Sequence, residues 1–210
     1  MKKFEEPDSR EPDKIEEPDL SGTYSYADYM KWTWDEMVEL IHGKIYKMSA
    51  PGSRHQIVVG NLHGLVWNFL RGKKCKVFIA PFDVRLPSSS IKKADVEIAT
   101  VVQPDLCVVC DLEKIDKRGC LGAPDWVVEV LSQFTSRKDL NEKFSVYEEC
   151  GVKEYWLIHP QEQTVLIYTA NSDGKYQGIL KPFTLEDKLS PTTLPGLVID
   201  LSEVFPQEEY

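Results

Sequence analysis

Hydrophobic positions recur with a helical period in three parts of the chain. In residues 53–72 (SRHQIVVGNLHGLVWNFLRG) apolar residues return every three or four positions, which predicts a helix with Ser53 as N-cap and Gly72 as its stop. A second long helix is expected from about Lys138 to Cys150. A short one is expected from Ser25 to Trp32. These helices lie at both ends of a run of strand-like segments.

Short apolar runs between and after the helices predict strands. They are CKVFIA, FDVRL, PDLCVVC and DWVVEVL, followed by EYWLIHP and TVLIYTA. ELIHGKIYKM is expected to form a hairpin, because His42-Gly43 separates two alternating runs. The segment DLEKIDKRGCLGA is polar and contains glycine, so we expect a loop there. Residues 176–210 hold short strand-like pieces such as LPGLVIDL. Together the elements predict an α/β or α+β layer fold.

The first 20 residues show no such periodicity. They repeat Glu-Pro-Asp at 6–8, 11–13 and 17–19, and they carry eight acids against four bases. Repeated prolines and charges do not build a core, so residues 1–22 are expected to be a disordered acidic tail and residues 23–210 one domain. Subtracting the −4 of these 20 residues from the net charge of −9 leaves −5. An acidic domain argues against a broad basic surface for nucleic acid.

The cysteines and the longest apolar runs bear on location. The chain has five cysteines, an odd number, and no stretch approaches the roughly 18 consecutive apolar residues of a membrane span. We therefore expect a reduced, cytoplasmic protein without a membrane segment. Cys107 and Cys110 have zinc-knuckle spacing, but no second CxxC pair accompanies them. They are interpreted as small apolar residues.

Five Pro-Asp pairs stand in the chain, and their surroundings separate them. Three belong to the acidic tail, and Asp125 of the fifth is expected to be a strand-start or turn residue. Asp105 opens one apolar strand, and Glu129 interrupts the next. Buried carboxylates are costly unless they are paired or bind a cation. One interpretation is a shared metal site. The other is that Asp105 caps a sheet edge while Glu129 pairs with an arginine.

The helix after Glu129 adds a lysine to the candidate site of Asp105 and Glu129. Its inward stripe is Leu140, Phe144 and Tyr147. At 100° per residue, Lys143 lies about 60° from Leu140 and about 40° from Tyr147, so it flanks the buried face. A lysine there can reach the strand carboxylates. The alternative is a lysine whose stem follows the edge of the core.

These residues resemble the PD-(D/E)XK restriction-endonuclease-like superfamily. More specifically, the chain resembles the bacterial "Uma-two" family of restriction endonucleases from about Tyr26 to Phe205. The resemblance rests on an ordered series of blocks: ELIHGKI, SRHQ, APFDVRL, VVQPDL, GAPDWVVEVLS, RKDLNEKFSVYEECGVKEYWLI and LPGLVIDL. Two positions depart from the pattern. Leu131 stands where the superfamily has its lysine, which the family supplies from the next helix at Lys143, and Lys44 stands where members often have an acid.

The resemblance implies a mixed β-sheet flanked by helices and metal-assisted hydrolysis of phosphodiester bonds, with DNA as the expected substrate. Asp105, Glu129 and the Val130 carbonyl would hold Mg²⁺ or Mn²⁺, which would activate a water and polarise the phosphate. Lys143 would position the water or neutralise developing negative charge. A homodimer is expected, since two copies can cut both strands.

Two further residues are candidates for this site. Glu39 lies in the hairpin, where the superfamily often places an extra acid, and the alternative is an exposed strand glutamate. His55 faces inward near a helix start, either as a hydrogen-bonded core histidine or in a supporting or phosphate-binding role. The whole chain is therefore interpreted as a metal-dependent endonuclease. The other hypothesis is a nuclease-fold module without hydrolysis that acts by binding or assembly, which the acidic charge and the displaced lysine favour.

Overall fold

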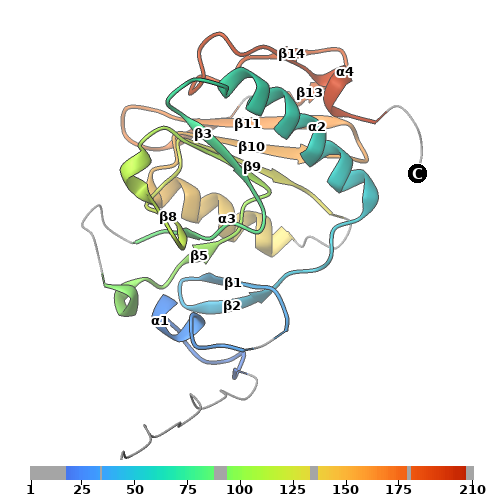
Figure 1. Cartoon of the computed structure of the whole chain (residues 1–210). Helices are drawn as coiled ribbons and strands as arrows, with labels where there is room; N and C mark the ends of the chain where they lie inside the picture. Colours follow the sequence, from blue (N-terminus) through green and yellow to red (C-terminus); the bar gives the residue numbers. More distant parts are fainter. Residues whose placement is uncertain (1–17, 34, 88–93, 133–136, 179–180, 207–210) are drawn as a thin grey trace, which may run out of the picture.

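The computed structural model describes residues 18–33, 35–87, 94–132, 137–178 and 181–206 (Figure 1). Residues 1–17 of the predicted acidic tail lie outside these ranges. The described end of that tail forms a turn, in which the Ser21 backbone and hydroxyl both donate to the Asp19 carboxylate. Within the described ranges, no helix has the length and apolar character needed to cross a membrane.

A mixed, seven-stranded sheet forms the centre of the fold. Only β9 and β10 run parallel, and the other neighbours are antiparallel. In order across the sheet the strands are β12 (Tyr176–Gly178), β11 (Thr164–Ala170), β10 (Glu154–His159), β9 (Trp126–Val130), β6 (Leu106–Val109) and β3 (Lys76–Ile79), with β13 (Phe183–Thr184) also paired to β11. The mixed α+β architecture predicted from the sequence is confirmed.

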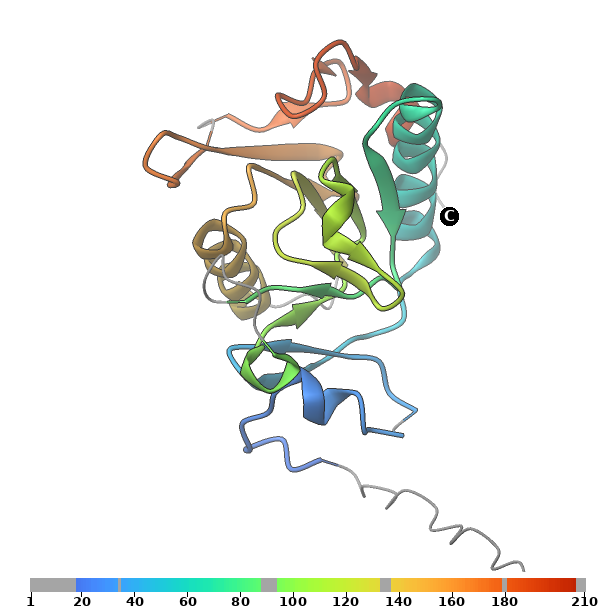
Figure 2. The ribbon, with the colours of Figure 1, turned by 60° about the vertical axis from the view of Figure 1, so that its left-hand side comes forward.

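Helices cover both faces of this sheet (Figures 1 and 2). On one face α2 (Ser53–Leu70) packs with α4 (Leu201–Val204) and the small β14–β15 pair (Lys188–Leu189 and Ile199–Asp200) over Trp126 and Trp156. On the other face α3 (Arg137–Cys150) packs over Val127 and Tyr155. Successive residues of a strand point to opposite faces. Both faces of β9 are therefore buried, which explains why its residues other than Glu129 are apolar.

A second, six-stranded sheet lies beside the α3 side of the first (Figure 2). With it lie α1 (Tyr26–Tyr29) and the short 3₁₀ turns η1 (Asp95–Glu97) and η2 (Leu112–Lys114). The strands in order are β2 (Lys44–Lys47), β1 (Val38–Ile41), β5 (Val101–Val102), β4 (Val84–Arg85), β8 (Gly119–Leu121) and β7 (Ile115–Asp116). Because β5 leads directly into β6, this sheet delivers its residues to the edge of the central one.

Several local predictions are confirmed and others are wrong. The β1–β2 hairpin forms as expected, and His42 and Gly43 both take the positive φ that a tight two-residue turn requires. Ser53 is not the N-cap of α2, because Gly52 precedes the helix and Ser53 is its first residue. The polar segment 111–123 is not a loop. It contains the β7–β8 hairpin at a sheet edge, where polar residues face solvent.

The prediction that the cysteines are all reduced is wrong for two of them. Cys75 and Cys110 form a disulfide, whereas Cys107, Cys120 and Cys150 are free. The strand register explains the pairing. Lys76 of β3 lies opposite Val109 of β6, so the next position brings Cys75 level with Cys110. This relationship depends on two strands separated along the chain, and spacing alone does not reveal it.

Candidate active site

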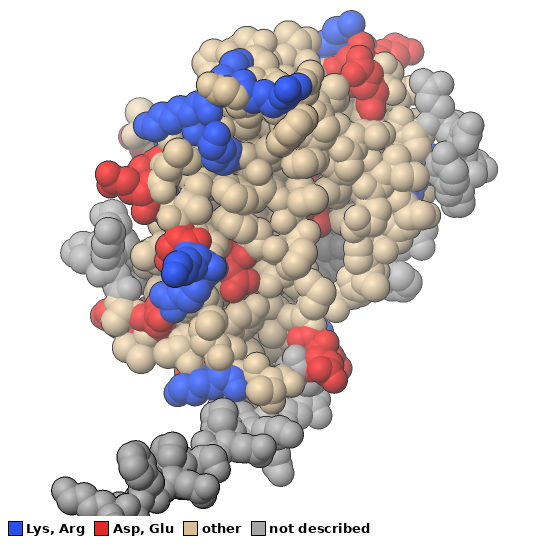
Figure 3. Space-filling model, in the orientation of Figure 1, with Lys and Arg blue, Asp and Glu red and all other residues tan. Residues whose placement is uncertain are grey.

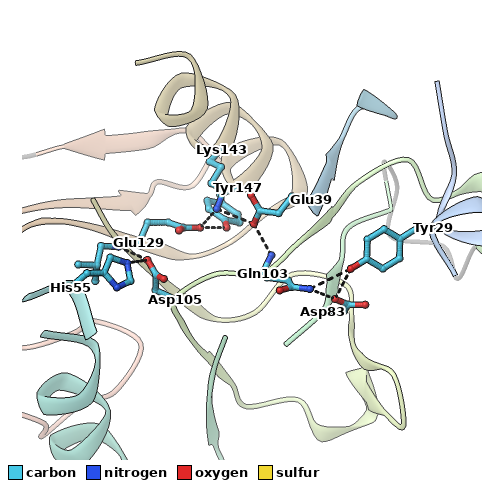
Figure 4. A network of polar contacts seen from close by, with 10 residues as sticks. Tyr29, Glu39, His55, Asp83, Gln103, Asp105, Glu129, Lys143 and Tyr147 are labelled. Atoms are coloured by element: carbon cyan, nitrogen blue, oxygen red, sulfur yellow. Dashed lines mark hydrogen bonds and ion pairs between the residues drawn. The ribbon is translucent and has the colours of Figure 1, made fainter. Parts of the chain in front are cut away.

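The two predicted metal-binding carboxylates lie side by side on neighbouring strands. Leu106 of β6 pairs with Val128 of β9. One step beyond this pair, Asp105 lies opposite Glu129. Directly opposed residues of an antiparallel pair have Cβ atoms about 4.5–5.5 Å apart and point to the same face. In Figure 4 the Glu129 carboxylate lies against Lys143 and Tyr147 of α3, and the neighbouring Asp105 carboxylate lies against His55.

Asp105 is held through one of its oxygens. Oδ2 accepts a hydrogen bond of 2.7 Å from the backbone N–H of Val130, and Nε2 of His55 lies 3.2 Å from the same oxygen. The Asp105 side chain is 18% exposed, so it lies at the floor of an opening and is not sealed in the core. Its position is thus fixed by both the sheet and the start of α2.

Glu129 is also held through one oxygen. Its Oε1 accepts from Nζ of Lys143 at 2.9 Å and from the hydroxyl of Tyr147 at 2.6 Å. Lys143 and Tyr147 are four residues apart on α3, which places them on one face of the helix. The predicted inward position of Lys143 is confirmed, and the lysine points to the carboxylates.

Glu39 is the third carboxylate of the site. It is buried in β1, so the alternative of an exposed strand glutamate is wrong. Its Oε1 lies 2.9 Å from Nζ of Lys143 and accepts a 2.7 Å hydrogen bond from the backbone N–H of Gln103. The Gln103 side chain in turn donates to Asp83 at 2.9 Å and to Tyr29 at 3.3 Å. A polar network therefore links the second sheet to the site (Figure 4).

The pKa values of the two central groups, Glu129 and Lys143, are both raised, but for different reasons. Burial raises the pKa of Glu129 to about 7; Lys143 opposes this increase, while Asp105 and Glu39 add to it. Burial alone would lower the pKa of Lys143, but the charges of Glu129 and Glu39 raise it well above its usual value. Lys143 is therefore a permanent cation near neutral pH. Three carboxylates surround it, so the cluster carries excess negative charge.

His55 is buried at the start of α2 and contacts Asp105. Burial lowers the pKa of His55, but the hydrogen bond and the charge of Asp105 outweigh it and leave the pKa raised. Nδ1 of His55 is buried and, within the described part of the chain, has no hydrogen-bond partner. The predicted inward position is confirmed. The ring holds Asp105 through one nitrogen and leaves the other available.

These side chains line one cleft of about 550 Å³. Its polar wall contains all five predicted side chains, and its rim is apolar. The rim residues come from the hairpin and the segment before α2, and from the turn after β3: Met37, Tyr46, Met48, Pro51, Ala80 and Pro81. The cleft thus lies between the central sheet, which carries Glu129, and the second sheet, which carries Glu39.

The donors present fit a hard divalent cation. Among the described residues, no three His, Cys, Asp or Glu side chains gather closely enough to form an ion site by themselves. Asp105 and Glu129 each use one oxygen for protein contacts. No described residue donates to Oδ1 of Asp105 or Oε2 of Glu129. Magnesium commonly binds through one or two carboxylates and retains several waters. Two carboxylate oxygens and the Val130 carbonyl meet this requirement.

Other motifs do not join the site. Asp125 lies directly before β9 and binds the backbone N–H of Cys110 and the ammonium of Lys153, which agrees with a strand-start role. Lys44 donates to the carbonyls of Ser21 and Gly22, so it anchors the segment before α1. Lys44, which stands where family members often have an acid, thus makes structural contacts outside the cleft.

Two further residues contact the predicted side chains directly and are not evident from the sequence pattern. Tyr147 lies in the apolar stripe of α3, but its hydroxyl binds Glu129. Its spacing of four from Lys143 was the available signal. Gln103 stands two residues before Asp105, and its backbone holds Glu39 from a position that only the pairing of β1 with β5 reveals.

Comparisons with known proteins agree with this geometry. The family model Uma2, described as "Putative restriction endonuclease", matches residues 26–202. An uncharacterized protein of Synechocystis sp. is 27% identical over 155 residues, which span 72% of this chain and 77% of that protein. A crystal structure from Anabaena variabilis, described as a putative nuclease of DUF820, superposes with a TM-score of 0.67 at 19% identity. The match covers 86% of this chain and 97% of the other. At that identity the likeness establishes the fold.

Proposed function

The chain belongs to the Uma2 family, and from this membership and the cleft we propose that it hydrolyses phosphodiester bonds in nucleic acid with Mg²⁺ or Mn²⁺ as cofactor. We propose DNA as the substrate. The observation that carries the proposal is the convergence of Glu129, Lys143 and Asp105 on one cleft from two strands and a helix. This is the arrangement that in-line attack of water on a phosphate requires.

Asp105 and Glu129, together with the Val130 carbonyl, would hold the ion through the carboxylate oxygens to which no described residue donates. When bound, a divalent cation supplies a Lewis acid that polarises a phosphoryl oxygen and lowers the pKa of an attacking water. Val130 N–H and His55 fix Asp105 in one orientation, and Tyr147 does the same for Glu129. Catalysis then needs little rearrangement of the carboxylates.

Lys143 has an electrostatic role in this proposal. Its raised pKa excludes it as a general base near neutral pH, because it retains its proton. It can instead donate a hydrogen bond to the phosphate as negative charge develops there. Glu39 holds the lysine from the opposite side and so keeps Nζ between the two sheets.

The test is cleavage of labelled duplex and single-stranded DNA and RNA in Mg²⁺ and in Mn²⁺. The chain supplies a matched pair of variants, Asp105→Asn and Asp125→Asn, since both aspartates follow a proline but only Asp105 lines the cleft. We expect Asp105→Asn to lose cleavage and Asp125→Asn to retain it. Cleavage that survives Asp105→Asn, or that proceeds fully in EDTA, contradicts the proposal.

The alternative is a module of this fold that binds without hydrolysis. The inward direction of Lys143 supports the enzyme, because it places a cation beside the carboxylates proposed to hold the ion. Binding of nucleic acid without cleavage under any ion condition would establish the alternative.

We also propose a homodimer, since two active sites related by a twofold axis can cut both strands of a duplex. Light scattering after gel filtration tests it. The proposed location is the cytoplasm, where nucleic acid lies. The Cys75–Cys110 disulfide is the observation that counts against that location.

A further inference from the structure

Positive charge is left unpaired in one part of this acidic protein. Between Glu39 and Asp83 the sequence contains no Asp or Glu, although the whole chain has 34 acids. This acid-free segment includes most of the residues named at the cleft rim, all of α2 and β3. Four of its bases, Arg71, Lys73, Lys74 and Lys76, stand within six residues at the end of α2 and the start of β3.

These four bases form the distal basic patch, and all four are exposed. Within the described ranges, none of them has a carboxylate partner. Eight described bases elsewhere do have one: Lys31, Lys47, Arg85, Arg118, Lys143, Lys153, Lys175 and Lys188. Lys44, Arg54 and Lys114 instead bind carbonyl or amide oxygens. Figure 3 shows the patch as a gathering of Lys and Arg at the upper left, over the end of α2 and the start of β3. Cations at a helix C-terminus stabilise its dipole, but Lys74 and Lys76 lie beyond the helix and that explanation does not extend to them.

An aromatic side chain adjoins the patch. Trp67 is 52% exposed, and the guanidinium of Arg71 lies 5.3 Å from its ring centre. The ammonium of Lys73 lies over the ring of Phe69 at 3.0 Å. Cations beside exposed aromatic rings suit a sugar-phosphate backbone, which offers anionic oxygens next to apolar sugar carbons.

One exposed face of α2 connects the patch to the cleft. Gln56 lines the cleft, and Gly60, Gly64, Trp67 and Arg71 follow it on the same side of the helix. A Cβ atom at Gly60 or Gly64 would meet nothing within 4 Å, so packing within the described protein does not explain either glycine. Glycine inside a helix costs about 1 kcal/mol relative to alanine. The result is a low, acid-free surface along which a large anion can approach.

We propose that the distal basic patch is a second nucleic-acid contact, which holds the duplex arm leaving the cleft along α2. The inference rests on the proposed function for the identity of the ligand. The 15 residues from Gln56 to Arg71 span about 22 Å at 1.5 Å per residue. A duplex rises about 3.4 Å per base pair. The patch therefore engages phosphates about seven base pairs from the cleft and gives a mainly acidic chain a local site for a polyanion.

The test uses the full chain with Asp105→Asn, so that substrate is not consumed, and fluorescein-labelled DNA hairpins with stems of about 6 and about 20 base pairs. Lys73→Gln/Lys74→Gln is compared with Lys31→Gln/Lys117→Gln, which removes equal charge at exposed positions outside the patch. Fluorescence anisotropy gives Kd across a salt series. We expect the patch variant to raise Kd on the long stem about tenfold and to lower the salt slope by about 2, with little effect on the short stem.

The inference fails if the control pair weakens binding equally, if both stems respond alike, or if the long stem does not respond. It also fails if light scattering shows that the patch variant dissociates a dimer, because the patch is then a contact between copies. Cleavage is measured in parallel with the same substitutions in the chain that retains Asp105. Patch-dependent binding without cleavage by the Asp105 chain supports the inference and contradicts the proposed function. Cleavage without patch-dependent binding supports the proposed function and contradicts the inference.

Discussion

The buried hydroxyl of Tyr147 donates a hydrogen bond of 2.6 Å to Oε1 of Glu129. Lys143 donates to the same oxygen, so Oε2 is the atom that faces the proposed ion. Groups that orient a metal ligand contribute to metal affinity although they do not touch the metal. Tyr147 is therefore a positioning residue in the proposed site.

Tyr147→Phe is expected to raise the Mg²⁺ concentration for half-maximal activity about tenfold. The variant retains the ring and removes only the hydrogen bond that orients Glu129. Activity is measured across an Mg²⁺ titration, and Mn²⁺ affinity is measured separately by calorimetry. Tyr155→Phe is the matched control, because the buried Tyr155 hydroxyl has no hydrogen-bond partner among the described residues. Equal shifts in both variants, or none in Tyr147→Phe, argue against the positioning role.

Lys143 separates two buried carboxylates, and its removal tests structure and catalysis together. Lys143→Met leaves Glu39 and Glu129 without their shared cation, which is expected to cost about 3 kcal/mol of unfolding free energy and to abolish cleavage. Urea unfolding and a cleavage assay measure the two effects.

The double variant Lys143→Met/Glu39→Gln separates them. Removing one of the two like charges is expected to restore most of the lost stability, while cleavage stays absent because the cation is still missing. A double variant that recovers cleavage would show that Lys143 acts only as a structural counter-ion.

The sequence predicted those parts of the site that local pattern controls. Asp105 opens one apolar strand, Glu129 interrupts another, and the helical period placed Lys143 at the flank of the buried face. The family resemblance, not the period, assigned Lys143 to the site. Contacts set by pairing between distant strands were not predictable. The Cys75–Cys110 disulfide depends on the register of β3 with β6, and the Gln103–Glu39 bond depends on β5 lying beside β1.

The second sheet was predicted only in part. Its β1–β2 hairpin and the FDVRL strand that contains β4 were expected, but β5 and β7 each contain only two residues, too few to show an alternating pattern. Arg85 in β4 is fully buried beside Tyr26. From the sequence alone, a charged residue such as Arg85 indicates an exposed segment. Tertiary contacts define these strands.

Glu154 is a buried carboxylate with a structural role, and its substitution should leave the cleft unaffected. It accepts hydrogen bonds from Trp156 Nε1, from the Thr192 hydroxyl, and from the backbone and hydroxyl of Thr193. These bonds tie β10 to the segment between β14 and β15. Glu154→Gln is expected to lower the unfolding free energy by about 2 kcal/mol, because bonds to a carboxylate are replaced by weaker neutral ones.

The measurement is urea unfolding together with the Mg²⁺ titration of cleavage. A change in the half-maximal Mg²⁺ concentration would show that Glu154 communicates with the cleft, contrary to this prediction. Thr192→Val provides the partner variant, which removes one donor and should cost less than Glu154→Gln.

Asp125 should make stability depend on pH in the acid range. Burial raises the pKa of Asp125, but hydrogen bonds from Lys153 and the Cys110 backbone outweigh it and leave the pKa below its ordinary value of 3.8. The unfolded chain therefore takes up this proton more readily than the folded one. The contribution is complete above the ordinary pKa and is lost as pH falls through the lower folded value.

Asp125→Asn removes this contribution but keeps an oxygen for the Cys110 N–H. Wild type is expected to exceed the variant by about 1 kcal/mol at neutral pH, because Lys153 is largely exposed and its ion pair is screened. The difference should shrink as the pH falls below the ordinary pKa of 3.8 and vanish once the folded aspartate is protonated. Urea unfolding at neutral, intermediate and acid pH measures it. A difference that grows as the pH falls would mean that the pKa of Asp125 is raised in the folded protein, which contradicts the assigned hydrogen bonds.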